Sequence, residues 1–388
     1  MSILNAFVES VGFVEMTIPR AIMILLAVFL AYLAIVQKYE PLLLLPLAFG
    51  ILIANIPVAG LDAYFQYEDG RRGLMNFLYQ GVLGVIYPPL IFLCIGSMTD
   101  FGPLISSPKS ALIGLGGQLG IFVAFGVSLM AGSLLSPIIP GFDGFTLREA
   151  ASIGIIGSSD GPTSIFTASR LAPEILSSVT IAAYSYMAIV SFIQPPIMRL
   201  LTTEKERAIV MPMQKRVTQR QKIIFPIAVT VITLLLVPAA GGLIAMLMLG
   251  NLIKESGVTE RYVRTLQNEV LNILTLLVAL SIGSSATADR FLNPGTLIII
   301  ACGLIAFIFG TVGGVLIAKL LCFVTGGKVN PLIGNSGVSA MPMAARVSQK
   351  MGLQYNNQNH LLMHAMGPIV SSTIGSAIIA GIFISLLK

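Results

Sequence analysis

Long apolar runs separated by short polar segments dominate the pattern of hydrophobic and polar positions along this chain. A helix needs about 20 mainly apolar residues to cross a bilayer; some runs reach that length and others are too short to cross alone. The pattern predicts an all-α polytopic membrane protein. The apolar segments lie at about 21–36, 41–59, 81–98, 111–139, 150–169, 176–201, 223–239, 241–253, 270–284, 296–325, 331–345 and 361–387.

The composition excludes a soluble protein of ordinary make-up. Apolar residues form 55% of the chain and charged residues 10%, whereas soluble domains carry about 25% charged residues. The formal net charge of +6 does not indicate nucleic-acid binding, because many Lys and Arg residues lie in connecting segments, as is typical of membrane proteins. We therefore expect a lipid bilayer around the chain and no nucleic acid partner.

The most basic connection, residues 202–222, divides the chain into two parts. An excess of basic residues is typical of cytoplasmic loops, so we expect this loop in the cytoplasm, where it can also contact an acidic partner. An amphipathic segment on the membrane surface is the alternative. The sequence thus predicts a first membrane repeat at 1–201 and a second at 223–388. The charged residues of the loop are Lys205, Arg207, Lys215, Arg216, Arg220 and Lys222, with Glu204 and Glu206.

Three short stretches of the first part recur in the same order in the second part. Each match alone is weak because Gly and Leu are common in membrane proteins, but the shared order favours an internal repeat. The matched stretches are Leu47–Ile53 with Leu247–Ile253, Ile95–Ser97 with Ile282–Ser284, and Gly157–Thr163 with Gly334–Ser339.

Two segments, 150–169 and 331–345, contain Gly and Pro residues that break a helix, and we interpret both as re-entrant hairpins. Each half then crosses the membrane five times, so the two halves form inverted repeats. The Lys and Arg residues agree with this inversion, because the loops expected in the cytoplasm are the more basic set. We expect the two hairpins to enter from opposite sides and their tips to meet near the midplane.

The first hairpin places a single carboxylate, Asp160, inside a long apolar run. Gly161 and Pro162 break the helix beside it and free backbone carbonyls, while Ser158, Ser159 and Thr163 add hydroxyl oxygens. A carboxylate at membrane depth is costly and usually functional, and oxygen ligands on broken backbone suit a monovalent cation or a proton. The alternative is a Gly-rich bend that Asp160 merely caps.

The second hairpin, Asn330–Arg346, offers amide and hydroxyl oxygens and ends in one cation. The guanidinium of Arg346 can hold a carboxylate through two N–H groups. The alternative is an arginine that reaches the membrane interface or pairs with a lipid phosphate. The polar side chains of this hairpin are Asn330, Asn335, Ser336 and Ser339.

Two further residue pairs have spacings that bear on a site. Tyr184 and Tyr186 are two apart and cannot share a helix face. Either one of them faces the site, as a donor to an anion or a proton relay, or both pack in the protein. His360 and His364 are four apart on a predicted helix, a spacing that could suit a metal, but without a third ligand in the sequence a polar helix face or a cap is favoured.

These stretches together resemble the β subunits of the sodium-translocating biotin-dependent decarboxylases, the group that includes oxaloacetate, glutaconyl-CoA and methylmalonyl-CoA decarboxylases. The resemblance is nearly full-length. It is carried by Lys38–Pro46, Ser97–Pro103, Gly157–Thr163, Ala183–Met187 and Asn330–Arg346.

The resemblance implies a multi-pass protein of a bacterial cell membrane that decarboxylates carboxybiotin and exports sodium while a proton is consumed. It implies sodium and carboxybiotin carried by a partner subunit as cofactors. The implied partners are a carboxyltransferase subunit, a biotin carrier subunit and a small membrane subunit, and a homo-oligomer is left open.

The resemblance also implies roles for individual residues. Asp160 would bind sodium and take part in proton movement. The polar hairpin would contribute Asn330, Gly334 and Ser339 to the same cation site. Tyr186 would donate or relay the proton, and Arg346 would hold the carboxylate before it leaves.

Two other function classes compete with a decarboxylase subunit. A sodium-coupled secondary transporter, either a sodium/proton exchanger or a carboxylate carrier, fits inverted repeats and a buried Asp equally well, but would need no biotinylated partner. A structural scaffold is disfavoured, because it has no reason to keep irregular backbone at membrane depth.

Overall fold

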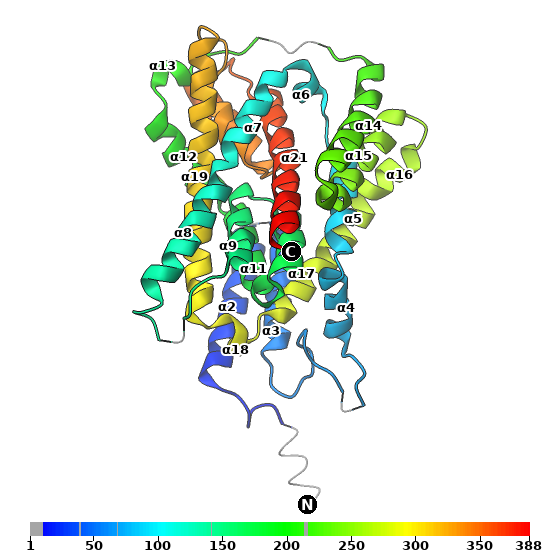
Figure 1. Cartoon of the computed structure of the whole chain (residues 1–388), viewed down its shortest axis with the longest axis vertical. Helices are drawn as coiled ribbons and strands as arrows, with labels where there is room; N and C mark the ends of the chain where they lie inside the picture. The colour runs from blue at the N-terminus through cyan, green and yellow to red at the C-terminus, as the bar shows by residue number, and fades with distance from the viewer. Residues whose placement is uncertain (1–10, 39, 68, 141, 213–215) are drawn as a thin grey trace, which may run out of the picture.

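The computed structural model describes residues 11–38, 40–67, 69–140, 142–212 and 216–388, and its regular structure is helical (Figure 1). Within these residues there is no strand, only an isolated bridge between Gln66 and Arg72. Three parts of the predicted features lie outside the described residues: residues 1–10 of the first repeat, Tyr39 of the stretch Lys38–Pro46, and Lys215 of the basic loop.

The helices of the first part run from α2 to α12. They are α2 (Ile18–Ile35), α3 (Pro41–Ala54), α4 (Leu74–Leu83), α5 (Tyr87–Met98), α6 (Gly102–Ser106), η1 (Pro108–Ser110), α7 (Ala111–Gly117), α8 (Leu119–Leu135), α9 (Leu147–Gly154), η2 (Ile155–Ser158), α10 (Gly161–Leu171), η3 (Pro173–Ile175), α11 (Leu176–Ala188) and α12 (Val190–Leu201).

The helices of the second part follow the short α13 of the basic loop. They are α13 (Glu204–Arg207), α14 (Gln219–Leu236), η4 (Pro238–Ala240), α15 (Gly241–Ser256), α16 (Glu260–Thr265), η5 (Leu266–Val270), α17 (Leu271–Ser285), α18 (Ala288–Phe291), α19 (Pro294–Val324), η6 (Pro331–Gly337), α20 (Met343–Tyr355) and α21 (Leu362–Leu387).

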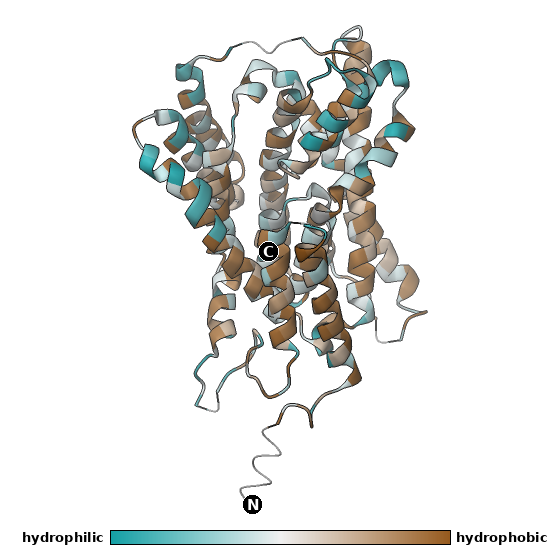
Figure 2. Ribbon diagram, turned by 180° about the vertical axis from the view of Figure 1, so that it is seen from behind, coloured by the Kyte–Doolittle hydropathy of each residue, from teal (hydrophilic) through white to brown (hydrophobic). Residues whose placement is uncertain are grey.

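The all-α polytopic fold predicted from the sequence is confirmed. Among the described residues, six helices are long and apolar enough to cross a membrane, or up to eight spans if each of two bent helix pairs counts as one. Figure 2 shows hydrophobic residues along these helices and hydrophilic residues gathered at the ends of the molecule. The ten crossings predicted exceed this number in part because α3 has 14 residues, about 21 Å, which is shorter than a bilayer core.

The two predicted hairpins begin at opposite ends of the molecule (Figure 1). The first, formed by α9, η2 and α10, follows the end of α8 that lies far from α13. The second, formed by η6 and α20, follows the end of α19 that lies near α13 and the basic loop. Inverted repeats require two such hairpins to begin at opposite ends, as these do. Inversion of the complete halves stays a prediction.

Helices of the two halves pack against each other in reciprocal pairs: α3 packs along α17, and α5 packs along α15. At each crossing a glycine faces a backbone carbonyl of the other helix so closely that a Cβ atom would overlap it. The contacts are Gly50 with Leu280, Gly283 with Leu47, Gly96 with Leu247, and Gly250 with Leu93. These glycines are the ones matched in the sequence repeat. The repeated stretches therefore correspond to helix–helix contacts, which are of the small-residue type common in membranes.

An ion-pair cluster joins helices at the end of the molecule that carries the basic loop. Lys222 Nζ on α14 lies 3.2 Å from Asp100 Oδ1 and 3.7 Å from Glu255 Oε2. The Asp100 carboxylate also accepts a hydrogen bond from Gly102 N at 2.9 Å. Partial burial opposes ionisation of Asp100, but the Gly102 N–H and the Lys222 ammonium outweigh it and hold the pKa of this carboxyl below its usual value. The cluster ties α14 to the segment after α5.

We expect Gly96→Ala to destabilise the protein by about 1–3 kcal/mol, because the new methyl group would overlap the α15 backbone and force α5 and α15 apart. The measurement is the apparent melting temperature of the purified protein in detergent. The matched control is Gly126→Ala on α8, where a Cβ atom meets nothing within 4 Å; it should leave the melting temperature unchanged or slightly raised. Equal losses in both variants would contradict the role assigned to the crossing.

We expect the Asp100 ion pair to stabilise the protein at neutral pH and to lose this effect in acid. A carboxyl group whose pKa is lower in the folded than in the unfolded state contributes stability above the unfolded value, about 3.9. That contribution disappears as the pH falls through the lower folded value. Melting curves between about pH 5 and pH 3 should therefore show a smaller acid loss for Asp100→Asn than for wild type. The exposed Asp143, replaced by Asn, should retain the wild-type profile.

Candidate cation site

The tip of the first hairpin reverses the chain at Ser159, whose φ of +54° lies in the left-handed region. Asp160 follows as the N-cap of α10, with Pro162 in the first turn of that helix, a position proline favours. Asp160 Oδ1 accepts a hydrogen bond from Thr163 N at 3.3 Å. Asp160 therefore does cap a helix, as the alternative interpretation expected, but the cap uses only one of its two carboxylate oxygens.

The tip of the second hairpin is the extended segment that follows η6, and it contacts the first tip directly. Ser339 N donates a hydrogen bond of 2.8 Å to the backbone carbonyl of Ser158. The expected meeting of the two tips is thus observed. Ser339 Oγ lies 3.0 Å from Ser372 Oγ on α21 and donates to it, so the second tip is also fixed to the last helix.

A cavity of about 370 Å³ lies beside the joined tips. Both hairpins contribute to its wall, since Asp160 and Ser339 line it together with Thr373 of α21. The rest of the wall is mainly apolar and includes four methionines, whose flexible side chains adapt to differently shaped ligands. The other lining residues are Ile95, Met98, Gly161, Pro162, Met187, Leu271, Met341, Pro342 and Met366.

The carboxylate of Asp160 has unused acceptor capacity. Asp160 is 5% exposed, and its second oxygen, Oδ2, accepts one hydrogen bond, from Ser376 Oγ at 3.2 Å. A carboxylate offers about four lone-pair positions, and the described residues form no salt bridge with it. An unpaired charge this deeply buried is costly unless a cation or a proton compensates it.

Further oxygen atoms in the tip lack partners. The hydroxyls of Ser159 and Thr163 are buried and have no hydrogen-bond partner of normal geometry among the described residues. Oxygen atoms of this kind fit the ligand set of a hard cation. The described residues contain no cluster of three or more His, Cys, Asp or Glu side chains, so the candidate ligand set has one carboxylate supplemented by neutral oxygens.

Helix α21 supplies polar residues that the sequence reasoning missed. Ser372 contacts Ser339, Thr373 lines the cavity, and Ser376 donates to Asp160. Gln118, at the break between α7 and α8, donates to Ser372 Oγ at 3.0 Å. The signal was present in the sequence as several hydroxyl residues inside an otherwise apolar 26-residue helix.

Two residues predicted at the cation site have other partners. Asn330 caps η6 by accepting from Leu332 N at 2.9 Å, and its amide donates to the backbone carbonyls of Arg207 and Ile209 at 3.0 and 2.8 Å. Asn330 therefore ties the base of the hairpin to α13. Gly334 packs against the α19 backbone at Val315, where a Cβ atom would overlap. Neither residue lines the Asp160 cavity.

Arg346 lies on an exposed face of α20 and lines a separate pocket of about 220 Å³ between α12 and α20. Arg199 and Lys350 line the same pocket, and no Asp or Glu does. The described residues form no salt bridge with any of these three cations. The structure thus places Arg346 in a group of cations near the basic loop and not beside Asp160.

The two tyrosines face different neighbours. The Tyr184 ring packs so closely on Gly161, next to Asp160, that a Cβ atom at Gly161 would overlap it. The Tyr186 hydroxyl donates a hydrogen bond to the backbone carbonyl of Ile300 on α19, and its ring packs on Gly303. Tyr184 is therefore the phenol nearer to the Asp160 tip, and Tyr186 joins α11 to α19.

The histidine pair does not share a helix. His360 precedes α21, which begins at Leu362, and its Nδ1 lies 3.4 Å from Gln349 Nε2. His364 lies in the first turns of α21. The expectation that both lie on one helix is wrong, because the helix starts after His360.

Comparison with known proteins gives matches along almost the whole chain. A family model described as the Na⁺-transporting oxaloacetate decarboxylase β subunit matches residues 19–387. The chain is 49% identical over 385 residues to methylmalonyl-CoA decarboxylase subunit β of Veillonella parvula, covering 99% of this chain and 98% of that protein.

Two further relatives are β subunits of decarboxylases named for other substrates. Glutaconyl-CoA decarboxylase subunit β of Acidaminococcus fermentans is 47% identical over 384 residues, covering 99% of this chain and 97% of that protein. The oxaloacetate decarboxylase β chain of Klebsiella pneumoniae is 44% identical over 433 residues, covering 99% of each chain.

Proposed function

The chain belongs to the family of Na⁺-transporting oxaloacetate decarboxylase β subunits, and on this basis we propose that it is the membrane subunit of a sodium-pumping decarboxylase. The resemblance drawn from five sequence stretches is thereby confirmed. Together with its apolar helices, membership makes the chain a multi-pass protein of a bacterial membrane. The sodium-coupled transporter considered as an alternative is not favoured, since the relatives described above are decarboxylase subunits.

In the proposed reaction, a partner subunit presents carboxybiotin from the cytoplasm. The bond between the ureido nitrogen and the carboxyl carbon breaks, its electron pair stays on nitrogen, and carbon dioxide leaves. The nitrogen takes up one proton, so each turnover consumes a proton. Transfer of the anionic carboxyl group from water into an apolar space favours its loss, because the leaving carbon dioxide is neutral. The methionine-lined cavity beside Asp160 is a space of this kind.

The observation that carries the proposal is the buried Asp160 carboxylate at the contact of two broken hairpins. Asp160, with the neutral oxygens of its tip, is proposed to hold the sodium ion, and Ser339 brings the second hairpin to the same cavity. A proton that reaches Asp160 would remove its charge and weaken sodium binding there. Sodium release and proton uptake are therefore linked at one carboxylate.

Four other residues, Arg346, Tyr186, Asn330 and Gly334, are proposed to act outside the Asp160 cavity. Arg346, with Arg199 and Lys350 beside it, is proposed to hold the carboxylate of the incoming substrate, and the absence of acidic side chains from this pocket supports that role. Tyr186 is proposed as the proton donor or relay, and to act so its hydroxyl must leave the Ile300 carbonyl. Asn330 and Gly334 are proposed to support sodium binding by positioning the second hairpin.

The proposed partners are a carboxyltransferase subunit, a biotin carrier subunit and a small membrane subunit. The family supports a multi-subunit complex, because its members are named as subunits of larger decarboxylases. The biotin carrier is the partner that must reach the cytoplasmic end of this chain.

We expect Asp160→Asn to lower sodium-dependent turnover by at least about 100-fold, because removing one partner of a buried charge pair costs about 3–5 kcal/mol. Asn is also a good N-cap, so α10 should remain folded. The measurement is carbon dioxide release from the carboxylated biotin carrier by the assembled complex, with and without sodium. The control is the exposed Asp143→Asn, which should behave as wild type. Full sodium-dependent turnover in Asp160→Asn would refute the sodium assignment.

We expect substitution of the two tyrosines to change different kinetic quantities in the same assay. Tyr186→Phe removes the proposed proton donor and should lower kcat by about 100-fold without changing the sodium concentration for half-maximal rate. Tyr184→Phe keeps the ring that packs on Gly161 but removes its hydroxyl next to Asp160, and it should raise that sodium concentration several-fold, about the effect of one hydrogen bond. The reverse assignment of the two effects would make Tyr184 the better candidate for the donor.

A further inference from the structure

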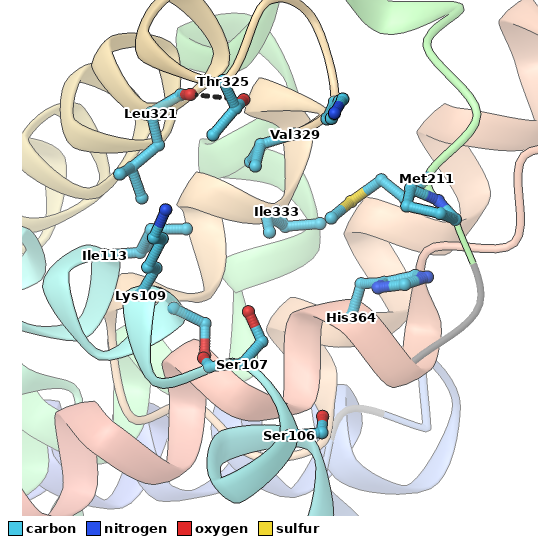
Figure 3. Close-up of a pocket in the computed structure, with 13 residues that line it drawn as sticks. Ser106, Ser107, Lys109, Ile113, Met211, Leu321, Thr325, Val329, Ile333 and His364 are labelled. Carbon is cyan, nitrogen blue, oxygen red and sulfur yellow. Dashed lines mark hydrogen bonds between the residues drawn. The ribbon is translucent and has the colours of Figure 1, made fainter. Parts of the chain in front are cut away.

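A second pocket, of about 240 Å³, opens at the end of the molecule that carries the basic loop. Figure 3 shows its wall, with Lys109 and Ser107 of the segment before α7 on one side and Thr325 and Val329 on another. It shares no lining residue with the Asp160 cavity. The remaining lining residues are Ser106, Ser110, Ile113, Met211, Pro212, Leu321, Lys328, Ile333 and His364.

The rim of this pocket is cationic. Lys109 belongs to η1 and Lys328 to the segment after α19; both line the pocket and are exposed, and neither makes an ion pair within the described part of the chain. No Asp or Glu side chain lines the pocket. Two ammonium groups without an acidic partner attract an anion, and lysine binds phosphate as a point charge.

The floor of the pocket is apolar, and exposed leucines neighbour it in sequence on α7 and α19. Ile113, Leu321 and Ile333 form part of the floor. On the same turns of α7 and α19, Leu112 and Leu320 are exposed by 48% and 55%, as expected of side chains in contact with lipid. A hydrophilic anion alone would leave this apolar surface uncovered, whereas a ligand with an anionic head and a hydrocarbon body would cover both parts.

We propose that this pocket binds the phosphate headgroup of an anionic phospholipid from the cytoplasmic leaflet. The phosphate lies between Lys109 and Lys328, and the acyl chains follow Leu112 and Leu320. Basic pockets between membrane helices on the cytoplasmic side are suited to such lipids. Because Ile333 belongs to the second hairpin, a bound lipid contacts the element whose tip meets Ser158.

The test measures stabilisation of the purified, assembled complex in detergent by added lipid. Phosphatidylglycerol should raise the melting temperature at a lower concentration than phosphatidylcholine. In Lys109→Gln/Lys328→Gln the concentration for half the effect should rise about thirtyfold, or about fivefold for each lysine. Lys109→Arg/Lys328→Arg keeps both charges and should retain the wild-type value. Lys205→Gln/Arg220→Gln removes two exposed charges outside the pocket and should also retain it.

Three results would overturn the proposal. One is an equal response of the Lys109→Gln/Lys328→Gln and Lys205→Gln/Arg220→Gln variants to phosphatidylglycerol. Another is a full shift with inorganic phosphate alone, which would make the site one for a free anion. The third is a shift with the carboxylated biotin carrier that depends on Lys109 and Lys328, which would make the pocket part of substrate entry.

Discussion

One backbone hydrogen bond, from Ser339 N to the carbonyl of Ser158, joins the tips of the two broken hairpins. In a membrane every backbone N–H and C=O needs a partner, and a broken helix leaves some of them free. Each hairpin tip therefore supplies a partner for one backbone group of the other. Gly157 and Gly334 complete the arrangement by letting the hairpins lie directly on the backbones of α8 and α19.

Asp160 combines a structural and a chemical task at this junction. As N-cap of α10 it satisfies a backbone N–H and lies at the positive end of the helix dipole, which favours its charged form. Burial acts in the opposite direction, because a charge away from water is costly. A carboxylate held between these opposing effects is suited to exchange one cation for another, since small changes around it alter which one binds.

The sequence predicts those features of the fold that depend on residues close to one another along the chain. Gly and Pro in apolar runs predict both hairpins, and the order of short matches predicts an internal repeat. That the repeated glycines, Gly50 with Gly250 and Gly96 with Gly283, lie at helix crossings is seen only in the structure. Span number is less predictable, because a helix as short as α3 occupies a run that looks long enough to cross.

The site is predicted only in part, because some of its residues come together from distant parts of the sequence. Asp160 and Ser339 are found by their own surroundings in sequence, and they do meet at one cavity. Asn330 resembles a ligand in the same way, but its partners are carbonyls of Arg207 and Ile209, and the path of that segment cannot be read from local pattern. The hydroxyls of α21 are missed because they lie more than 200 residues from Asp160, as the bond from Ser376 shows.

The glycine contacts have a consequence for how such a chain can be assembled. Each half offers a glycine and a carbonyl on one helix and the same pair on another. Because α3 meets α17 and α5 meets α15, each of these helices contacts the repeat equivalent of the other helix in its own half. Such an interface is self-complementary, like that of a two-fold symmetric dimer, although both sides belong to one chain. A single half therefore carries both sides of these glycine contacts, the glycine surface and the carbonyl surface alike.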